Sequence, residues 1–426
     1  MRSPPGVDVG FNAAKLRARY PCLRRKLDGK RPVYLDNACT ALKPRCVVER
    51  MSDFYLNFGG CGGKRSMHLF SQRVEAITAE ARQEVADFIG AGSSSEIVFT
   101  SGTTEACNLV ARAFPYEKRR REVVLTDLEH NSLLLPFCEA ARRGEVVLRI
   151  CPTREGRLDT DVLERLVTSK TALVAMTRSS NVFGGSLPAA EAARIAHRKG
   201  ACLLVDDAQY LSSHREDVSA ADVDFAAFSA HKIGGPFGVG VLYGKRRLLN
   251  RLGLYKVGGG MVRSVNWDGK NLAAAYLDAP ARFEAGVQNF GGIVGLAEAI
   301  RFLKGIPRDG LRKHVAGLVL RAAKGLSRRP EVKVLGRPEH LREGSIVSFQ
   351  PRHRAFSPVD FNLYLNHELR GHFIAVRVGE QCAHLAHQGL GVPATVRLSF
   401  FAYNLPGEVD LFLDALDAYL REACRG

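Results

Sequence analysis

Short apolar runs alternate with amphipathic stretches through most of the first 245 residues, and this alternation restricts the fold more than any other feature. Apolar runs of strand length lie at 96–100, 123–125, 172–176, 202–205, 225–228 and 239–243. Helical patterns at 74–89 and 103–114 flank the first run, and Ser71 is placed to cap the earlier one. Strands alternating with helices are typical of parallel sheets covered by helices. We predict an α/β fold whose mostly parallel sheet has about six or seven strands, and we take seven.

The pattern changes after about residue 295. Helical and strand patterns then follow at 292–303, 346–349, 373–376, 395–399 and 408–420. This order indicates a smaller α+β unit with its own sheet. We predict a large domain over 31–294, a small C-terminal domain over 295–426, and an N-terminal segment, 1–30, that packs with the small domain.

Composition excludes several classes of protein. The chain has 426 residues, 46% of them hydrophobic, which suits two domains with substantial cores. No apolar run has the roughly 18 residues of a membrane-spanning helix, and the first residues lack a signal-peptide core, so we expect a cytoplasmic protein. The ten cysteines are scattered without zinc or disulfide spacing, so no metal site is predicted.

The formal net charge of +17 raises the question of an acidic partner, such as a nucleic acid or an acidic carrier protein. The basic residues are spread along the chain, and no arginine-rich tail is present. A solvated basic surface is therefore favoured. Nucleic acid is not expected as a partner, although contact with tRNA stays open.

Two strand ends carry side chains that suit a pyridoxal phosphate site. Lys232 follows the run 225–228 and precedes a glycine-rich stretch, and Asp206 ends the run 202–205. A lysine amine can form a Schiff base with an aldehyde, and an acid can keep a pyridine nitrogen protonated. A lysine in an isolated Ser-x-His-Lys motif is usually a surface residue. The prediction of a cofactor site therefore depends on Lys232 and Asp206 occurring together, each at the end of a strand and in this order along the chain.

A phosphate site is predicted where the run 96–100 meets the next helix. The hydroxyls and N–H groups of Thr103 and Thr104 would face an anion at the positive end of that helix. A simple capping turn explains the same residues equally well. Ser229 and His231, beside the lysine, could close on the same phosphate.

Further polar side chains follow other strands. His130 could stack on a flat cofactor, although a lone histidine is more often structural. Asn181 and Gln209 could bond a ring hydroxyl. Ligands of open α/β sheets bind at the carboxyl ends of the strands, and all of these candidates lie there.

Several ordered motifs together resemble one family. They are Tyr34–Thr40, Glu96–Glu105, Gly258–Met261, Arg377–Ala383 and the stretches around Asp206 and Lys232. The chain resembles class V, fold-type I pyridoxal phosphate enzymes, and within them the group II cysteine desulfurases and their selenocysteine lyase relatives. The resemblance covers nearly the whole chain, to Tyr403-Asn404.

The resemblance implies an activity, conversion of L-cysteine to L-alanine with sulfur passed as a persulfide to an acceptor protein, and a homodimer. It implies that Cys382 takes up the sulfur, and that Arg397 and Arg377, with Asn181, meet the substrate. It also implies the cofactor's surroundings: Lys232 as the Schiff-base lysine, Asp206 at the ring nitrogen, His130 on the ring, Gln209 at the ring oxygen, and Thr103, Thr104, Ser229 and His231 at the phosphate.

Three departures bear on substrate and acceptor. Glu380 and Gln381 stand where the family usually has histidines, and a carboxylate would disfavour a thiolate unless a cation such as Arg377 offset it. Val287-Gln288 replaces a Thr-Pro whose threonine reaches the partner subunit's phosphate. The third is Lys64-Arg65-Ser66-Met67-His68, where a glycine is lost while Arg65 and His68 keep their places.

Two alternatives remain open at this point. Another class V enzyme, a selenocysteine lyase, aminotransferase, C–S lyase or epimerase, would act on a different amino acid, and a transaminase would leave Cys382 as an inert loop cysteine. A basic binding or scaffold protein could retain the fold without chemistry. The intact set of Lys232, Asp206 and Arg397 argues against that second alternative.

Overall fold

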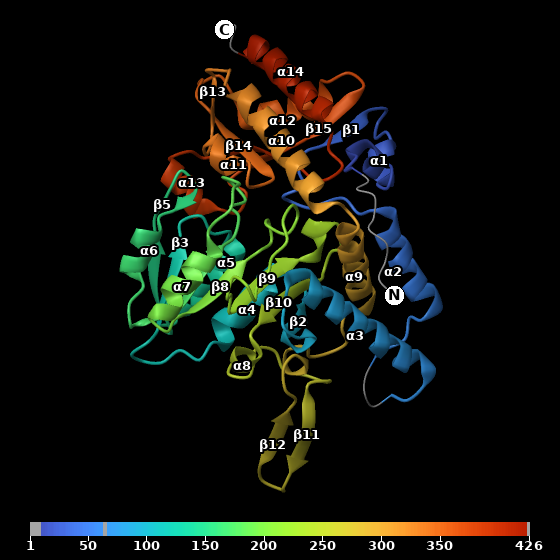
Figure 1. Cartoon of the computed structure of the whole chain (residues 1–426), viewed down its shortest axis with the longest axis vertical. Helices are drawn as coiled ribbons and strands as arrows, with labels where there is room; N and C mark the ends of the chain where they lie inside the picture. The colour runs from blue at the N-terminus through green and yellow to red at the C-terminus, as the bar shows by residue number, and fades with distance from the viewer. Residues whose placement is uncertain (1–9, 63–65, 424–426) are drawn as a thin grey trace.

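The apolar runs form a seven-stranded sheet at the centre of the molecule, which we describe from a computed structural model covering residues 10–62 and 66–423 (Figure 1). The strand order is β2-β10-β9-β8-β7-β3-β4. The strands are β2 (Ile97–Thr100), β3 (Glu122–Thr126), β4 (Val147–Cys151), β7 (Thr171–Thr177), β8 (Cys202–Asp206), β9 (Phe225–Ser229) and β10 (Gly240–Gly244).

Strands β9, β8, β7, β3 and β4 pair in parallel, whereas β10 is antiparallel to both of its neighbours, β2 and β9. The predicted mostly parallel seven-stranded sheet is therefore confirmed. The sequence pattern indicated six of the strands directly. The seventh, β4, escaped it because this edge strand is largely exposed and carries Arg149 among its apolar residues.

Successive side chains of the central strands point to opposite faces of the sheet, and each face has its own core. Val123, Leu125 and Leu173 face one side, while Val124 and Val174 face the other. The first core includes side chains of α4 (Thr103–Ala113), α5 (Asn131–Arg142) and α8 (Arg246–Leu249). The second includes side chains of α3 (Leu69–Ile89), α6 (Thr160–Leu166), α7 (Ala189–Arg198) and α9 (Phe290–Lys304).

Helix α3 begins earlier than the sequence pattern predicted. Its first residue is Leu69, and the Nδ1 atom of His68 accepts a hydrogen bond from the Ser71 N–H at 3.1 Å. The prediction that Ser71 caps this helix was wrong, because the imidazole supplies the acceptor that a hydroxyl was expected to supply. Ser71 itself is fully buried inside the first turn.

A four-stranded antiparallel sheet, ordered β13-β14-β17-β16, organises the C-terminal part, which lies at one end of the large sheet (Figure 1). Its strands are β13 (Val332–Val334), β14 (Ile346–Pro351), β16 (Arg377–Gly379) and β17 (Thr395–Ser399). Its helices are α10 (Arg308–Leu326), α11 (Pro338–Leu341), α12 (Pro358–His367), α13 (His384–Leu390) and α14 (Pro406–Ala423).

The N-terminal residues contact this C-terminal part. Strand β1 (Arg31–Tyr34) pairs in parallel with β15 (His372–Ala375). In α1 (Ala13–Arg17), the Arg17 guanidinium donates to the Tyr403 carbonyl at 3.2 Å and pairs with Glu408 at 2.8 Å. The division at residues 31 and 295 stays a prediction. Residues 1–30 were predicted to pack with the small domain. The structure shows that β1, which lies within 31–294, also contacts the C-terminal part.

The remaining elements are short or peripheral. Helix α2 (Arg45–Asn57) packs on α9, and a hairpin of β11 (Val262–Trp267) and β12 (Leu272–Tyr276) projects from the end opposite the C-terminal part (Figure 1). The other small elements are β5 (Thr153–Arg154), β6 (Arg157–Leu158) and the 3-10 helices η1 (Pro21–Arg24), η2 (Ser94–Glu96), η3 (Ala230–Ile233) and η4 (Ala281–Phe283). Within the described ranges, no helix is long and apolar enough to cross a membrane.

Candidate active site

A cavity of about 290 Å³ opens where the carboxyl ends of the parallel strands meet the C-terminal part. Asp206 ends β8 and Ser229 ends β9, while β16, β17 and the turn after β16 supply the facing wall. The structure brings every predicted site residue to this one cavity. They are Thr103, Thr104, His130, Asn181, Asp206, Gln209, Ser229, His231, Lys232, Arg377, Cys382 and Arg397.

Hydroxyl groups gather at the first turn of α4. The Oγ atom of Ser229 accepts a hydrogen bond from the Thr103 N–H at 2.8 Å and lies 2.7 Å from the Thr103 Oγ1. The Oγ1 of Thr104 lies 2.7 Å from the Oγ of Ser132. Because the helix dipole is positive here, the group can bind an anion such as a phosphate. Ser132 was not predicted, since its place depends on the start of the next helix, α5.

The anion site depends on close approach of two backbones. A Cβ atom added at Gly240 in β10 would lie 2.4 Å from the Cα of Gly102, the residue that precedes α4. Real Cβ atoms do not come this close to backbone. Gly240 therefore allows the start of α4 to lie directly against the end of the sheet.

Lys232 lies in η3, directly after β9, and its amine borders the cavity near Asp206. Burial lowers the pKa of Lys232, although Asp206 acts in the opposite direction. Burial likewise raises the pKa of Asp206, which is only 4% exposed, while Lys232 and the Ala208 N–H oppose that shift. The two groups stabilise each other's charge in a poorly hydrated place.

His130 caps α5, and its Nδ1 accepts a hydrogen bond from the Ser132 N–H at 3.1 Å. Burial lowers the pKa of His130 to about 4, and the charges of Lys232 and Arg397 add to the effect. The ring is thus neutral at neutral pH, with its proton on Nε2. A neutral flat ring in the wall of the cavity can stack on another ring.

Glu129, beside this histidine, is a buried residue that the sequence patterns did not single out. Its carboxyl accepts hydrogen bonds from the Thr126 Oγ1 at 2.5 Å and from the Thr177 N–H at 2.8 Å. Burial raises its pKa to about 8. Glu129 joins the ends of β3 and β7, the two strands that flank His130 and Asn181.

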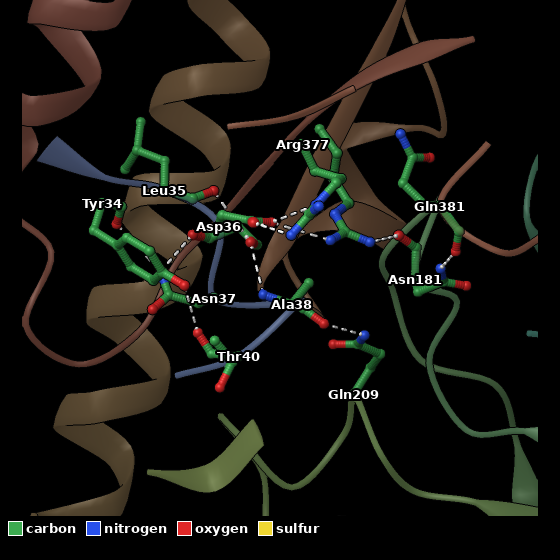
Figure 2. A network of polar contacts seen from close by, with 12 residues as sticks. Tyr34, Leu35, Asp36, Asn37, Ala38, Thr40, Asn181, Gln209, Arg377 and Gln381 are labelled. Atoms are coloured by element: carbon green, nitrogen blue, oxygen red, sulfur yellow. Dashed lines mark hydrogen bonds and ion pairs between the residues drawn. The ribbon is translucent and has the colours of Figure 1, made fainter. Parts of the chain in front are cut away.

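Two arginines, Arg377 and Arg397, converge on one carboxylate, Asp36, and Figure 2 shows Arg377 beside it. The Asp36 side chain lies 2.6 Å from the Arg377 guanidinium and 3.3 Å from that of Arg397. Burial alone would lower the pKa of Arg377, but the neighbouring Asp36 carboxylate outweighs burial, so the pKa of Arg377 is raised. The Nε of Arg397, a residue only 3% exposed, has no hydrogen-bond partner in the described part of the chain. That unpaired donor leaves capacity for an added anion.

Asn181 and Gln209 are engaged with other parts of the chain. The carbonyl of Asn181 accepts a bond from Arg397 at 3.0 Å, and its amide donates to the Gln381 carbonyl at 2.7 Å (Figure 2). The Gln209 amide donates to the Ala38 carbonyl at 2.8 Å. These bonds fix the orientation of both side chains at the cavity wall.

Cys382 lies on the turn between β16 and α13, and its side chain is exposed. Gln381 and Cys382 both have positive φ angles, 45° and 55°, which non-glycine residues rarely adopt. Such conformations cost roughly 1 to 3 kcal/mol each and persist only where surrounding contacts impose them. Here the Asn131 N–H donates to the Cys382 carbonyl at 2.7 Å.

Glu380 has a basic neighbour other than Arg377. Its carboxylate lies 3.1 Å from the Nε2 of His384, the first residue of α13, whereas Arg377 is held by Asp36. Arg377 nevertheless lines the same cavity as Cys382, so its effect on the thiol stays a prediction. Spacing along the chain could not show that a residue 341 positions earlier would take the arginine.

The described residues of the other two departures do not line this pocket. Val287 is 79% exposed, and His68 caps α3. Lys64 and Arg65 lie outside the described residues. Cys39, in contrast, lines the cavity and was quoted only as part of a motif.

Fold and site together define the class of protein. The chain belongs to the aminotransferase class-V family, whose sequence model matches residues 33–412. It is similar to a cysteine desulfurase of Dickeya dadantii (strain 3937), 37% identical over 405 residues that span 94% of this chain and 95% of the relative. A cysteine desulfurase of Haloferax volcanii is 36% identical over 434 residues, spanning 98% and 99%.

Solved structures agree with this assignment. The cysteine desulfurase CsdA (S-sulfonic acid) from Escherichia coli matches with a TM-score of 0.86 at 34% identity, covering 97% of this chain and 99% of that one. The apo cysteine desulfurase of Thermococcus onnurineus NA1 matches with a TM-score of 0.84 at 35% identity, covering 92% and 95%. The predicted resemblance and the predicted fold type are confirmed.

Proposed function

We propose that this protein is a cysteine desulfurase that converts L-cysteine to L-alanine and takes the sulfur onto Cys382. One observation carries the proposal. An exposed cysteine, a lysine whose charge interacts with a buried aspartate, and two arginines line a single cavity in a chain similar to cysteine desulfurases.

The proposed cofactor is pyridoxal phosphate, and the donor set of the cavity fits it. The hydroxyls of Thr103, Thr104 and Ser229, together with His231, would hold the phosphate, and Asp206 would hold the ring nitrogen. His130 would stack on the ring, while Gln209 and Asn181 would meet its oxygen. When bound, this cofactor supplies an aldehyde that takes up amines and a ring that withdraws electrons from the substrate Cα.

The arginines are proposed to bind the substrate carboxylate. A guanidinium presents parallel N–H donors that match two carboxylate oxygens. The unpaired Nε of Arg397 points to that role. Arg377, the cross-strand neighbour of Arg397, binds the same Asp36 and adds a second positive charge to this wall.

Lys232 and Cys382 are the proposed catalytic residues. Because burial lowers the pKa of Lys232, its Nζ holds a proton less tightly and can take one from the substrate Cα and return it. The Cys382 thiolate attacks the substrate sulfur, so that an S–S bond forms as the C–S bond breaks and its electron pair stays with the substrate Cβ. The Cβ then takes a proton, and alanine leaves. An acceptor thiol then removes the outer sulfur.

The alternative is another class V enzyme, such as a selenocysteine lyase, aminotransferase, C–S lyase or epimerase. The reaction products distinguish this alternative from a cysteine desulfurase. With L-cysteine and a thiol reductant, we expect equal amounts of alanine and sulfide, and keto-acid formation or racemisation without alanine would exclude a desulfurase.

A second experiment tests the cofactor. We expect wild-type protein incubated with pyridoxal phosphate to be yellow and Lys232→Ala to lose the lysine-dependent visible absorbance. Wild-type protein that stays colourless would contradict the cofactor assignment.

We further propose a homodimer, a sulfur-acceptor protein as partner, and a cytoplasmic location. Large apolar side chains on and near α2 and α3 support the homodimer, because they are strongly exposed in the single chain. They are Leu56 (81%), Met67 (83%), Leu69 (82%) and Phe70 (57%).

A further inference from the structure

Gln381 combines a buried side chain with a strained backbone. It is 9% exposed, and both ends of its amide are bonded to the same residue, Thr395. The Nε2 of Gln381 donates to the Thr395 carbonyl at 3.1 Å, and the Thr395 Oγ1 donates to the Gln381 Oε1 at 2.9 Å. The side chain thus forms a two-bond clamp between the turn after β16 and the first residue of β17.

The backbone on both sides of the cysteine thiol is also fixed. The Gln381 carbonyl accepts the Asn181 amide at 2.7 Å, which Figure 2 shows, and the Cys382 carbonyl accepts the Asn131 N–H at 2.7 Å. Both residues of the turn are left-handed, so they would relax if the contacts that impose this conformation were removed. The clamp is a contact made by a buried side chain of the turn itself.

The clamp also fixes the position of Cys382 relative to Arg397. Thr395 and Arg397 are two residues apart in β17, so their side chains project from the same face of the sheet. The carbonyl of Asn181 accepts from Arg397 while its amide donates to Gln381. A substrate held by Arg397 and the thiol of Cys382 are therefore both located relative to the same strand and the same asparagine.

We propose that Gln381 is a positioning residue for sulfur transfer: its clamp on Thr395 holds the left-handed turn that presents Cys382 to substrate bound at Arg397. The inference rests on the proposed function, since Cys382 needs positioning only if it accepts sulfur. Gln381 also lines the cavity, but both ends of its amide are bonded to Thr395. Its removal should slow the attack by Cys382 and leave cofactor and cysteine binding in place.

The test is a single-turnover reaction of the holoenzyme, loaded with pyridoxal phosphate, with L-cysteine. Persulfide on Cys382 is followed by mass spectrometry, and cysteine binding by the change in cofactor absorbance. For Gln381→Ala we expect persulfide to form at least about tenfold more slowly, because small misplacements of reacting groups have large effects on rate. The half-saturating cysteine concentration should stay within about twofold of wild type.

Gln388→Ala is the matched control. Gln388 lies nearby on α13, is exposed, and should give wild-type rates. Thr395→Val keeps the carbonyl but removes the hydroxyl, which donates to Gln381 and also lies 3.1 Å from the Nε2 of the buried His387. We expect it to slow persulfide formation less than Gln381→Ala does and to leave cysteine binding unchanged. The double variant should be no slower than Gln381→Ala alone, which would show that Thr395→Val acts through the clamp and not through His387.

Three outcomes overturn the inference. One is a wild-type rate of persulfide formation in Gln381→Ala, and another is an equal loss of cysteine binding and rate, which marks a general structural role. If Gln381→Ala does not fold, Thr395→Val decides, and a wild-type rate there contradicts the clamp. Failure of the proposed function looks different, because wild-type protein itself would then form no persulfide on Cys382.

Discussion

At the scale of single residues, the cavity is organised by charges that come from distant parts of the chain. Asp36 follows β1 after Leu35, yet it holds Arg377 and Arg397 from the C-terminal part. Asp206 and Lys232 line the same cavity, and their opposite charges interact. Opposite charges thus partly offset each other within the cavity.

Asp36→Asn tests the arginine pair. The substitution leaves the buried Arg397 without its counter-charge, so we expect the free energy of unfolding to fall by about 3 to 5 kcal/mol and KM for cysteine to rise. Urea denaturation and steady-state kinetics measure the two effects. Asp410→Asn, which breaks the exposed pair with Arg321, is the control and should change neither. Unchanged stability in Asp36→Asn would contradict the account.

Glu129 gives the molecule a pH-dependent stability. Burial raises its folded-state pKa from 4.5 to about 8, so the folded chain binds this proton more tightly than the unfolded chain does. The resulting stability is complete below about pH 4.5 and is lost as the pH rises through about 8. In Glu129→Gln we expect the decline between about pH 5 and about pH 8 to become shallower by about 2 to 4 kcal/mol. Denaturation at a series of pH values measures it, and parallel curves for both proteins would refute the assignment.

At the scale of elements, the site depends on where strands end and helices begin. The residues that follow β2, β8 and β9 were predictable, because alternation reveals buried strands and ligands gather at their carboxyl ends. Strand β4 and the start of α3 were not, because exposed edges and imidazole caps leave weak patterns. The bonds of Asp36 and Gln381 were also invisible, since they join residues brought together only by the folded chain.

Gly240→Ala tests the contact between β10 and α4. The added Cβ would meet the Gly102 backbone at 2.4 Å, so the start of α4 must move. We expect a loss of about 1 to 3 kcal/mol in stability and weaker binding of pyridoxal phosphate, measured by denaturation and by cofactor titration. Gly317→Ala, in the middle of α10 with open space at its Cβ, should instead stabilise slightly. Unaltered cofactor affinity in Gly240→Ala would contradict this view of the anion site.

At the scale of the whole molecule, the cavity lies between two parts of the chain that have separate sheets, one seven-stranded and one four-stranded, and that share one continuous apolar core. The large part supplies the anion site, Asp206 and Lys232. The C-terminal part supplies the arginines and Cys382. Because the site residues come from two parts of the chain, each motif could be recognised in the sequence by itself. The contacts between the motifs could be seen only in the structure.

The proposed homodimer belongs to this scale. We expect sedimentation to give twice the chain mass of 46.7 kDa. Replacing both Leu56 and Leu69 by Glu should shift the protein to a single chain, because buried charge would oppose association. Val359→Glu, on the exposed face of α12, is the control and should stay dimeric. A wild-type protein that sediments as one chain at micromolar concentration would contradict the dimer.

Transfer of sulfur to Cys382 is the central claim, and the fate of one substrate sulfur tests it most directly. Holoenzyme is mixed with an equal amount of L-cysteine without reductant, and the peptide containing Cys382 is weighed by mass spectrometry while alanine is counted. The account predicts one added sulfur atom on Cys382 for each alanine formed, and neither product in Cys382→Ser. Alanine formed by Cys382→Ser at the wild-type rate would contradict it.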